Sequence, residues 1–333
     1  MSAQRKRDWF TPAMLLAVAL AWVFPRLGAG DGPLPVALLV KLGVALIFFL
    51  YGLTLSFAAL RAGALHWRLH LLVQGMTFLA LPLLGLGIAA ATAGRIPADL
   101  RLGIVFLSVL PSTVSSAVAL TAAAGGNVAG AVFNATASSL LGIVLTPLWL
   151  GFYLKTGGDA GPILPVILNL ICWLLLPMVA GQLCRLWAAD WAARHKPRLQ
   201  VADRLVILMI IYTSFCDSVQ NGVWQGRGAG ELILVLGLTV LLLSLALGLV
   251  DRGGRWLGFG RGDRAAALFC GSQKSLAVGA PMAGLLFAGQ PVLGSVLLPV
   301  MIYHMLQLLV AGWLAARCEA GFASNGRSRD ISA

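Results

Sequence analysis

Charged residues are scarce in this chain of 333 residues. Asp, Glu, Lys and Arg make up 11% of it, whereas hydrophobic residues make up 59% and the mean hydropathy is +0.90. A soluble domain averages about 25% charged residues, so the composition excludes a water-soluble globule and a disordered chain. The sequence therefore predicts an all-α integral membrane protein, whose length suits about ten spans of roughly 20 residues.

Motifs for several kinds of chemistry are also absent. The five Cys form no C-x-x-C pair, which excludes a zinc site and a disulfide framework. No P-loop, no H-E-x-x-H and no acidic cluster occur, so we predict no ATP motor, no enzyme, no metal and no resident cofactor. The net charge of +12 comes from positive residues at the ends of apolar runs, which indicates membrane topology and not nucleic-acid binding.

Apolar runs predict ten membrane-spanning helices. Their approximate bounds are 11–25, 34–60, 70–92, 102–124, 128–154, 162–187, 204–222, 231–250, 265–288 and 292–316. Of the 24 Lys and Arg residues, 17 fall on one side of this arrangement and five on the other, and the remaining two, Lys41 and Lys274, lie inside spans. This asymmetry predicts a multi-pass protein of the plasma (inner) membrane with both termini cytoplasmic.

Ten spans divide into two repeats of five, and an odd repeat length makes the second repeat inverted. The predicted divisions are a cytoplasmic N-terminus at 1–10, a first five-helix repeat at 11–154, a second, inverted repeat at 155–316 and a cytoplasmic polar tail at 317–333. The fourth and ninth spans are interrupted at corresponding positions, 110–116 and 269–275, by small polar residues. Matched breaks indicate a transporter site; a single break could be a Ser-rich helix contact with a Pro kink.

Charged residues inside the predicted spans also indicate a functional site. Lys274 lies in the ninth-span break, where an uncompensated ammonium is costly, so we expect it to be functional; the alternative is a structural ion pair. Asp217, in the seventh span, could pair with Lys274 or, slightly better by depth, with Lys41. A desolvated ammonium can also release its proton, which makes a proton a possible coupling ion.

Other polar side chains occupy the predicted spans. Asn134 and Ser138 share one helix face, where their oxygens could ligate a hard cation or form a bond between helices. The full set of candidate substrate- and ion-binding residues is Ser115, Ser116, Asn134, Ser138, Gln74, Thr77, Ser272, Gln273, Lys274 and Asp217.

Several segments together carry a family resemblance. They are Trp67-Arg68-Leu69-His70, Val114-Ser115-Ser116-Ala117-Val118, Gly125-Gly126-Asn127, Phe133-Asn134, Phe215-Cys216-Asp217 and Phe269-Cys270-Gly271-Ser272-Gln273-Lys274-Ser275. In these segments the chain resembles the bile acid:sodium symporter family (solute carrier family 10), and most of all its divergent seventh-member branch with bacterial relatives. The resemblance implies a panel domain and a core domain, with the broken fourth and ninth helices crossing in the core. Substrate would sit beside the crossing, with two sodium ions behind it.

The sodium ligands that the resemblance implies carry over only in part. Ala117 stands where the family has Asn, and Phe269 stands where it has the sodium-binding Glu, with Lys274 five residues later. The family's third-span Gln maps to Gln74 by residue type or to Thr77 by its distance from Pro82. A site that loses a carboxylate and gains an ammonium cannot hold sodium in the family's way.

The predicted function is secondary transport of a small organic anion or amphipath by alternating access. The coupling ion is sodium, a proton or neither, and sodium coupling is in doubt because of Phe269 and Lys274. The expected partners are the substrate and the lipid bilayer, with no nucleic acid, and the chain is expected to be a monomer or a homodimer. The alternative is a regulatory membrane protein that keeps the transporter fold without transporting.

Overall fold

The computed structural model describes residues 9–33, 35–55, 63–156, 168, 171–225 and 227–330. Across these ranges each regular element is a helix, and six helices are long and apolar enough to cross a membrane. The predicted segment 1–10, the end of span 34–60 and the start of span 162–187 fall largely outside them. Helices suit a bilayer because each segment satisfies its own backbone hydrogen bonds.

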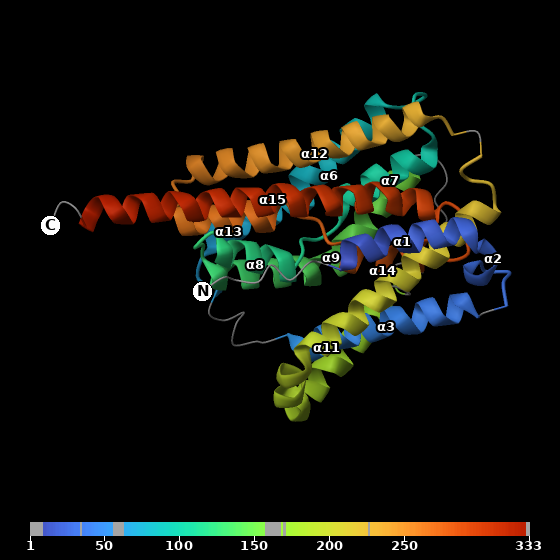
Figure 1. Cartoon of the computed structure of the whole chain (residues 1–333), viewed down its shortest axis with the longest axis horizontal. Coiled ribbons are helices and arrows are strands. Elements are labelled where there is room, and N and C mark those ends of the chain that lie inside the picture. The colour runs from blue at the N-terminus through green and yellow to red at the C-terminus, as the bar shows by residue number, and fades with distance from the viewer. Residues whose placement is uncertain are drawn as a thin grey trace. The chain divides into compact units, whose positions relative to one another are not determined.

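Figure 1 shows the described helices, coloured along the chain. They are α1 (Phe10–Val23), α2 (Pro25–Gly28), α3 (Val36–Thr54), α5 (Trp67–Gly75), η1 (Met76–Ala80), α6 (Leu81–Ala91), α7 (Ala98–Val109), α8 (Ser115–Ala123), α9 (Val128–Thr156), η2 (Ile171–Leu175), α11 (Leu176–Gln220), α12 (Ala229–Trp256), α13 (Arg261–Ser272), α14 (Leu276–Leu286) and α15 (Leu293–Asp330). The elements η1 and η2 are single π-helical turns.

The chain divides into two compact units, each drawn from both halves of the sequence. One unit comprises segments Met1–Thr54, Asn169–Arg227 and Ala280–Leu297, and so contains α1, α3 and α11. The other comprises Leu55–Leu168, Gly228–Gly279 and Leu298–Ala333. The second unit contains the interruptions of both the fourth and the ninth span.

Helix α11 folds back on itself in the first unit, beside α3 (Figure 1). A straight helix of its 45 residues would be about 68 Å long. Instead, the α3 backbone at Gly52 lies against Met178 near the start of α11, and Gly43 lies against Val206 in its second half. Both halves of α11 therefore line α3, and Pro197 lies between them at the turn. The first arm contains residues 176–187 of the predicted span 162–187 and continues beyond it, and the second arm contains residues 204–220 of the predicted span 204–222.

A tight backbone approach joins the first arm of α11 to α3. A Cβ atom added at Gly52 would lie 1.9 Å from the Met178 carbonyl oxygen, and one at Gly181 would lie 2.0 Å from the Phe49 carbonyl oxygen. Small residues allow this close contact between membrane helices.

We expect Gly52→Ala to destabilise the protein, because the two backbones must move apart. The expected cost is about 3 kcal/mol, typical of severe overpacking, measured as a lower melting temperature in detergent. Gly237→Ala, on α12, is the matched control, because a Cβ there meets nothing within 4 Å. Equal melting temperatures for the two variants would contradict the contact.

Candidate functional site

The breaks in the fourth and ninth spans meet within the second unit. Helix α7 ends at Val109, and Leu110 is extended (ψ 149°), as expected for a residue that precedes a proline. Helix α13 ends at Ser272, and Gln273 is likewise extended (ψ 147°). The Ser275 backbone N–H donates to the Pro111 carbonyl oxygen across 2.8 Å. The two breaks are thus joined main chain to main chain.

Both breaks are shorter than predicted. Residues 115–116 already form the first turn of α8, and residues 269–272 still belong to α13. Ser115 is exposed at the start of α8. The Ser272 hydroxyl donates to the Leu268 carbonyl of its own helix at 2.6 Å, so this predicted site residue is engaged in α13.

Lys274 is 1% exposed and lies at the centre of the crossing. Its ammonium donates to the carbonyl oxygens of Ser108 at 2.6 Å, Leu110 at 2.7 Å and Thr77 at 3.1 Å. An ammonium has three N–H donors, and three acceptors surround it here. These are the freed carbonyls of the fourth-span break together with one carbonyl of the third span.

The chain frees these three carbonyls for identifiable reasons. Ser108 lies in the last turn of α7, where carbonyls have no partner within the helix. In the third span the Leu81 N–H bonds back to the Met76 carbonyl, which is the π-helical pattern. Continuing that pattern, Thr77 would need an N–H from Pro82, and proline has none.

A second set of polar side chains surrounds Gln273. Its Oε1 accepts from the Thr113 hydroxyl at 2.6 Å and from the Ser116 hydroxyl at 2.8 Å. Its Nε2, although buried, has no hydrogen-bond partner in the described part of the chain, and neither does the Ser112 hydroxyl. The Ser112 N–H donates to the Ser138 hydroxyl at 2.9 Å. The crossing therefore unites four predicted site residues, namely Lys274, Gln273, Ser116 and Ser138, and leaves donors free.

Helix α15 holds the ninth-span break from one side. The Tyr303 hydroxyl donates to the Ser272 carbonyl at 2.6 Å. Gln307 pairs with both backbone groups of Lys274: its Oε1 accepts from the N–H at 2.8 Å and its Nε2 donates to the carbonyl at 2.9 Å. Sequence reasoning did not select Tyr303 or Gln307; their only signal is a polar group inside an apolar span.

Gln74 and Asn134 form a separate pair behind the crossing. Gln74 Nε2 donates to the Asn134 carbonyl at 3.0 Å and to its Oδ1 at 3.2 Å, and Asn134 Nδ2 donates to the Gly130 carbonyl at 2.9 Å. The Thr77 hydroxyl donates to the Val73 carbonyl of its own span at 2.8 Å. Close to this pair lies an apolar cluster of buried residues that includes Ala117, Ala131, Ala135, Phe269 and Cys270.

The residues present do not fit a sodium site of the family's kind. Phe269 and Ala117, both fully buried in the apolar cluster, offer no oxygen from their side chains. The Asn134 side chain is already bonded to Gln74 and to Gly130. Hard cations require several oxygen ligands, and at the position where the resemblance implies a carboxylate the chain has the phenyl ring of Phe269.

Asp217 belongs to the first unit and has a local partner. Its Oδ1 accepts from the Gly30 N–H at 2.7 Å, which fixes the turn after α2. The Lys41 ammonium lies over the Trp173 ring, 5.9 Å from the ring centroid. Among the described residues no ion pair joins Asp217 to Lys41 or to Lys274, the two partners that the sequence left open. The hydrogen-bond partner of Asp217 is thus the backbone N–H of Gly30 and not a lysine.

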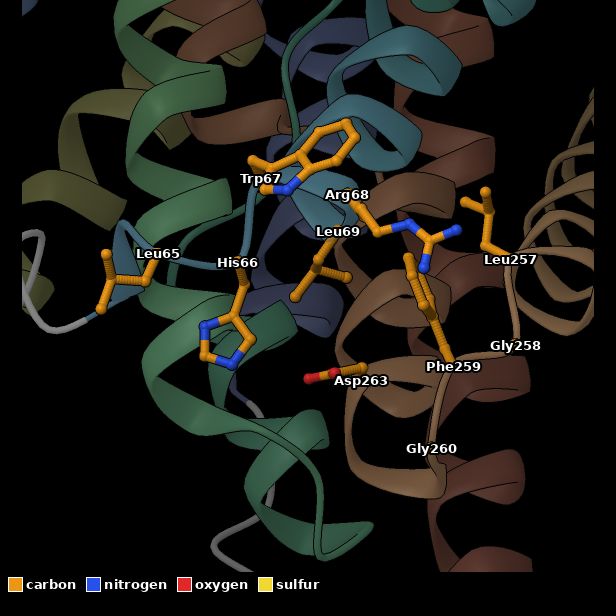
Figure 2. Close-up of a pocket in the computed structure, with 10 residues that line it drawn as sticks. All are labelled: Leu65, His66, Trp67, Arg68, Leu69, Leu257, Gly258, Phe259, Gly260 and Asp263. Carbon is orange, nitrogen blue, oxygen red and sulfur yellow. The ribbon is translucent and has the colours of Figure 1, made fainter.

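A hollow of about 300 Å³ lies where α5 and α13 begin (Figure 2). Its lining includes His66, Trp67, Arg68, Phe259 and Asp263, and in Figure 2 His66 and Asp263 approach from different elements. Asp263 accepts from Asn127 Nδ2 at 2.7 Å. Exposed basic and aromatic side chains of this kind are typical of a membrane interface. None of the residues that form the crossing lines this hollow.

Broken helices that cross inside a membrane-embedded helical unit are typical of membrane transporters. Residues 8–320 match the SBF-like CPA transporter family, and the chain belongs to this family. It is 43% identical over 313 residues to the uncharacterized protein PA2026 of Pseudomonas aeruginosa, covering 93% of this chain and 92% of that protein. It is 41% identical over 317 residues to the candidate symporter YfeH of Escherichia coli (strain K12), covering 95% and 94%.

A mammalian relative is similar over the same extent. The sodium/bile acid cotransporter 7 of Rattus norvegicus is 34% identical over 322 residues, covering 96% of this chain and 94% of that protein. The resemblance to the bile acid:sodium symporter group is therefore confirmed. Since the family is one of transporters and the Escherichia coli and rat relatives are named as a symporter and a cotransporter, the chain is a multi-pass membrane transporter and not an enzyme.

Proposed function

We propose that this protein is a secondary transporter of small organic anions or amphipaths that works by alternating access without sodium coupling. The observation that carries the proposal is the crossing itself, where two broken helices bond directly to each other and buried donors stay unpartnered. Substrate sites of secondary transporters lie at such discontinuous helices. The name of the rat relative adds that sodium and bile acids are handled by one member of the family.

The chemistry of the free groups favours an anion. Gln273 Nε2 and the Ser112 hydroxyl are donors without acceptors, and α8 and α14 begin beside them at Ser115 and Leu276. The amino ends of helices carry partial positive charge and unsatisfied N–H groups. A carboxylate or sulfonate of the substrate would supply the missing acceptors. Lys274 would act only through its field, because its donors already reach carbonyls.

The architecture proposed for this function is that of ten spans in two inverted repeats, 11–154 and 155–316. In this architecture the second compact unit, which contains both breaks, would be the core domain, and the first compact unit would be the panel domain. The short segments 1–10 and 317–333 would both be cytoplasmic in a plasma (inner) membrane. The protein would act as a monomer or a homodimer, and without sodium the proposal leaves a proton or no coupling ion.

Uptake into proteoliposomes tests the transport function. Labelled taurocholate, a steroid sulfate and a short-chain monocarboxylate serve as probes, under imposed pH and potential gradients. We expect saturable uptake of at least one probe above that of protein-free vesicles. If all three probes enter at the rate of protein-free vesicles under each gradient, the proposed organic-anion transport is wrong.

A further inference from the structure

We infer that Lys274 is a resident cation, which supplies from within the chain the positive charge that a bound monovalent ion would bring to the crossing. The acceptors are the three carbonyl oxygens of Thr77, Ser108 and Leu110, which we call the carbonyl cage. The inference rests on the proposed function only where it explains independence from sodium. The geometry of the cage stands without it.

The carbonyl cage has the chemistry of a cation site. Carbonyl oxygens are hard ligands for alkali and alkaline-earth ions. Two of the three belong to the carboxyl end of α7, where the helix dipole concentrates negative charge. Each is freed by the sequence itself, by the end of α7 before Pro111 or by the missing N–H of Pro82. These oxygens would be costly to bury without a hydrogen-bond donor or a cation.

Within the described ranges, no carboxylate pairs with the Lys274 ammonium. Among the described residues Lys274 forms no salt bridge, and Asp217 is engaged by the Gly30 N–H. Two ion pairs elsewhere in the described ranges join Asp251 to Arg255 and to Arg264. The cage carbonyls are therefore the groups that compensate the charge of Lys274, and its role is not that of a partner in an ion pair.

A tethered cation has a mechanical consequence that a free ion lacks. The Lys274 backbone is held by Gln307 of α15, and its ammonium reaches the third span and the fourth-span break. Lys274 therefore connects the ninth-span break, to which it belongs, with α15, the third span and the fourth-span break. A sodium ion would connect them only while bound, whereas the ammonium connects them in every ionic condition.

Thermal unfolding of purified protein in detergent tests this inference without any substrate. Removing the ammonium by Lys274→Ala leaves the cage empty and should lower the melting temperature by about 5 °C. Propylammonium, which replaces the lost part of the side chain, should raise it again saturably. Tetramethylammonium, which has no N–H donor, should not do so at equal ionic strength. Wild-type protein should respond to neither amine nor to sodium.

Lys41→Ala is the matched control, since it removes a membrane-embedded lysine that lies over Trp173 and not in the cage. It should show no response to propylammonium. The inference is overturned if Lys274→Ala melts like wild type, if tetramethylammonium rescues as well as propylammonium, or if sodium saturably stabilises the wild type. Because no substrate is used, a failed uptake assay leaves this test unaffected.

A second pair of variants serves if Lys274→Ala does not accumulate. Lys274→Gln retains an amide with two N–H donors, whereas Lys274→Met retains length alone. The expected order of melting temperatures is wild type, then Lys274→Gln, then Lys274→Met. A Met variant as stable as wild type, or more stable than the Gln variant, would overturn the inference in the same way.

Discussion

Lys274→Met should reduce uptake to the level of protein-free vesicles. The methionine fills most of the volume of the lysine but leaves the carbonyls of Thr77, Ser108 and Leu110 without their donor. We expect a loss of about 1–3 kcal/mol of stability together with the loss of transport, because the broken helices lose their common anchor. Initial rates of uptake and melting temperatures, measured on the same preparation, separate the two effects.

Two further variants test whether a positive charge alone, or an ion pair with Asp217, accounts for that loss. Lys274→Arg keeps the charge, but its planar fork does not match a cage built for three donors on one nitrogen, so it should also be inactive. If Lys274 served only to neutralise Asp217, the double variant Lys274→Met with Asp217→Asn should recover uptake. We expect the double variant to stay inactive, because Asp217 is held by Gly30. Recovery would show that the role assigned to Lys274 is wrong.

Gln273→Glu should abolish anion uptake while the fold survives. The new carboxylate can still accept from the hydroxyls of Thr113 and Ser116, which now bond to Gln273 Oε1. It replaces the free Nε2 donor with a second negative oxygen, however, beside the place where the substrate anion would bind. Like charges brought together cost several kcal/mol, and each 1.4 kcal/mol is about tenfold in affinity. We therefore expect a loss of about 100-fold or more in uptake at low substrate concentration.

Gln290→Glu is the control for added charge. It lies in the exposed turn between α14 and α15, and should leave uptake nearly unchanged. A Gln273→Glu variant that transports as well as Gln290→Glu would remove Gln273 from the substrate site. A Gln273→Glu variant that fails to fold would show that its two hydroxyl bonds need a neutral amide.

Much of this site could be predicted from residue patterns. The break in the fourth span follows from Pro111, which forces Leu110 out of the helical conformation. Lys274 stands out because an ammonium inside a span must be compensated. The freed carbonyls of the fourth-span break, which accept from Lys274, are acceptors that such a break predicts. The Thr77 carbonyl did not stand out, since a backbone carbonyl carries no side-chain identity. Only the π-helical turn before Pro82 leaves the Thr77 carbonyl without a backbone partner in its own span. A shift of one hydrogen bond cannot be recognised in an apolar run of sequence.

Two other features depended on contacts that periodicity does not contain. The partner of Asp217 is the backbone of Gly30, 187 residues earlier, whereas depth alone favoured a lysine. Similarly, the sequence predicts two spans, 162–187 and 204–222, but it does not predict that one continuous helix, α11, runs through the turn between them and packs both arms on α3. Local signals predict where a helix stops; they do not predict which distant backbone group completes it.

The dependence of uptake on sodium tests the central claim most directly. Initial rates for a transported probe are measured in wild-type proteoliposomes from zero to 150 mM sodium, about the physiological ionic strength, with choline keeping the ionic strength constant. Because Lys274 already provides the charge at the carbonyl cage and Phe269 replaces a ligand, we predict a rate that does not change with sodium. A saturable rise with sodium in the millimolar range would contradict the account.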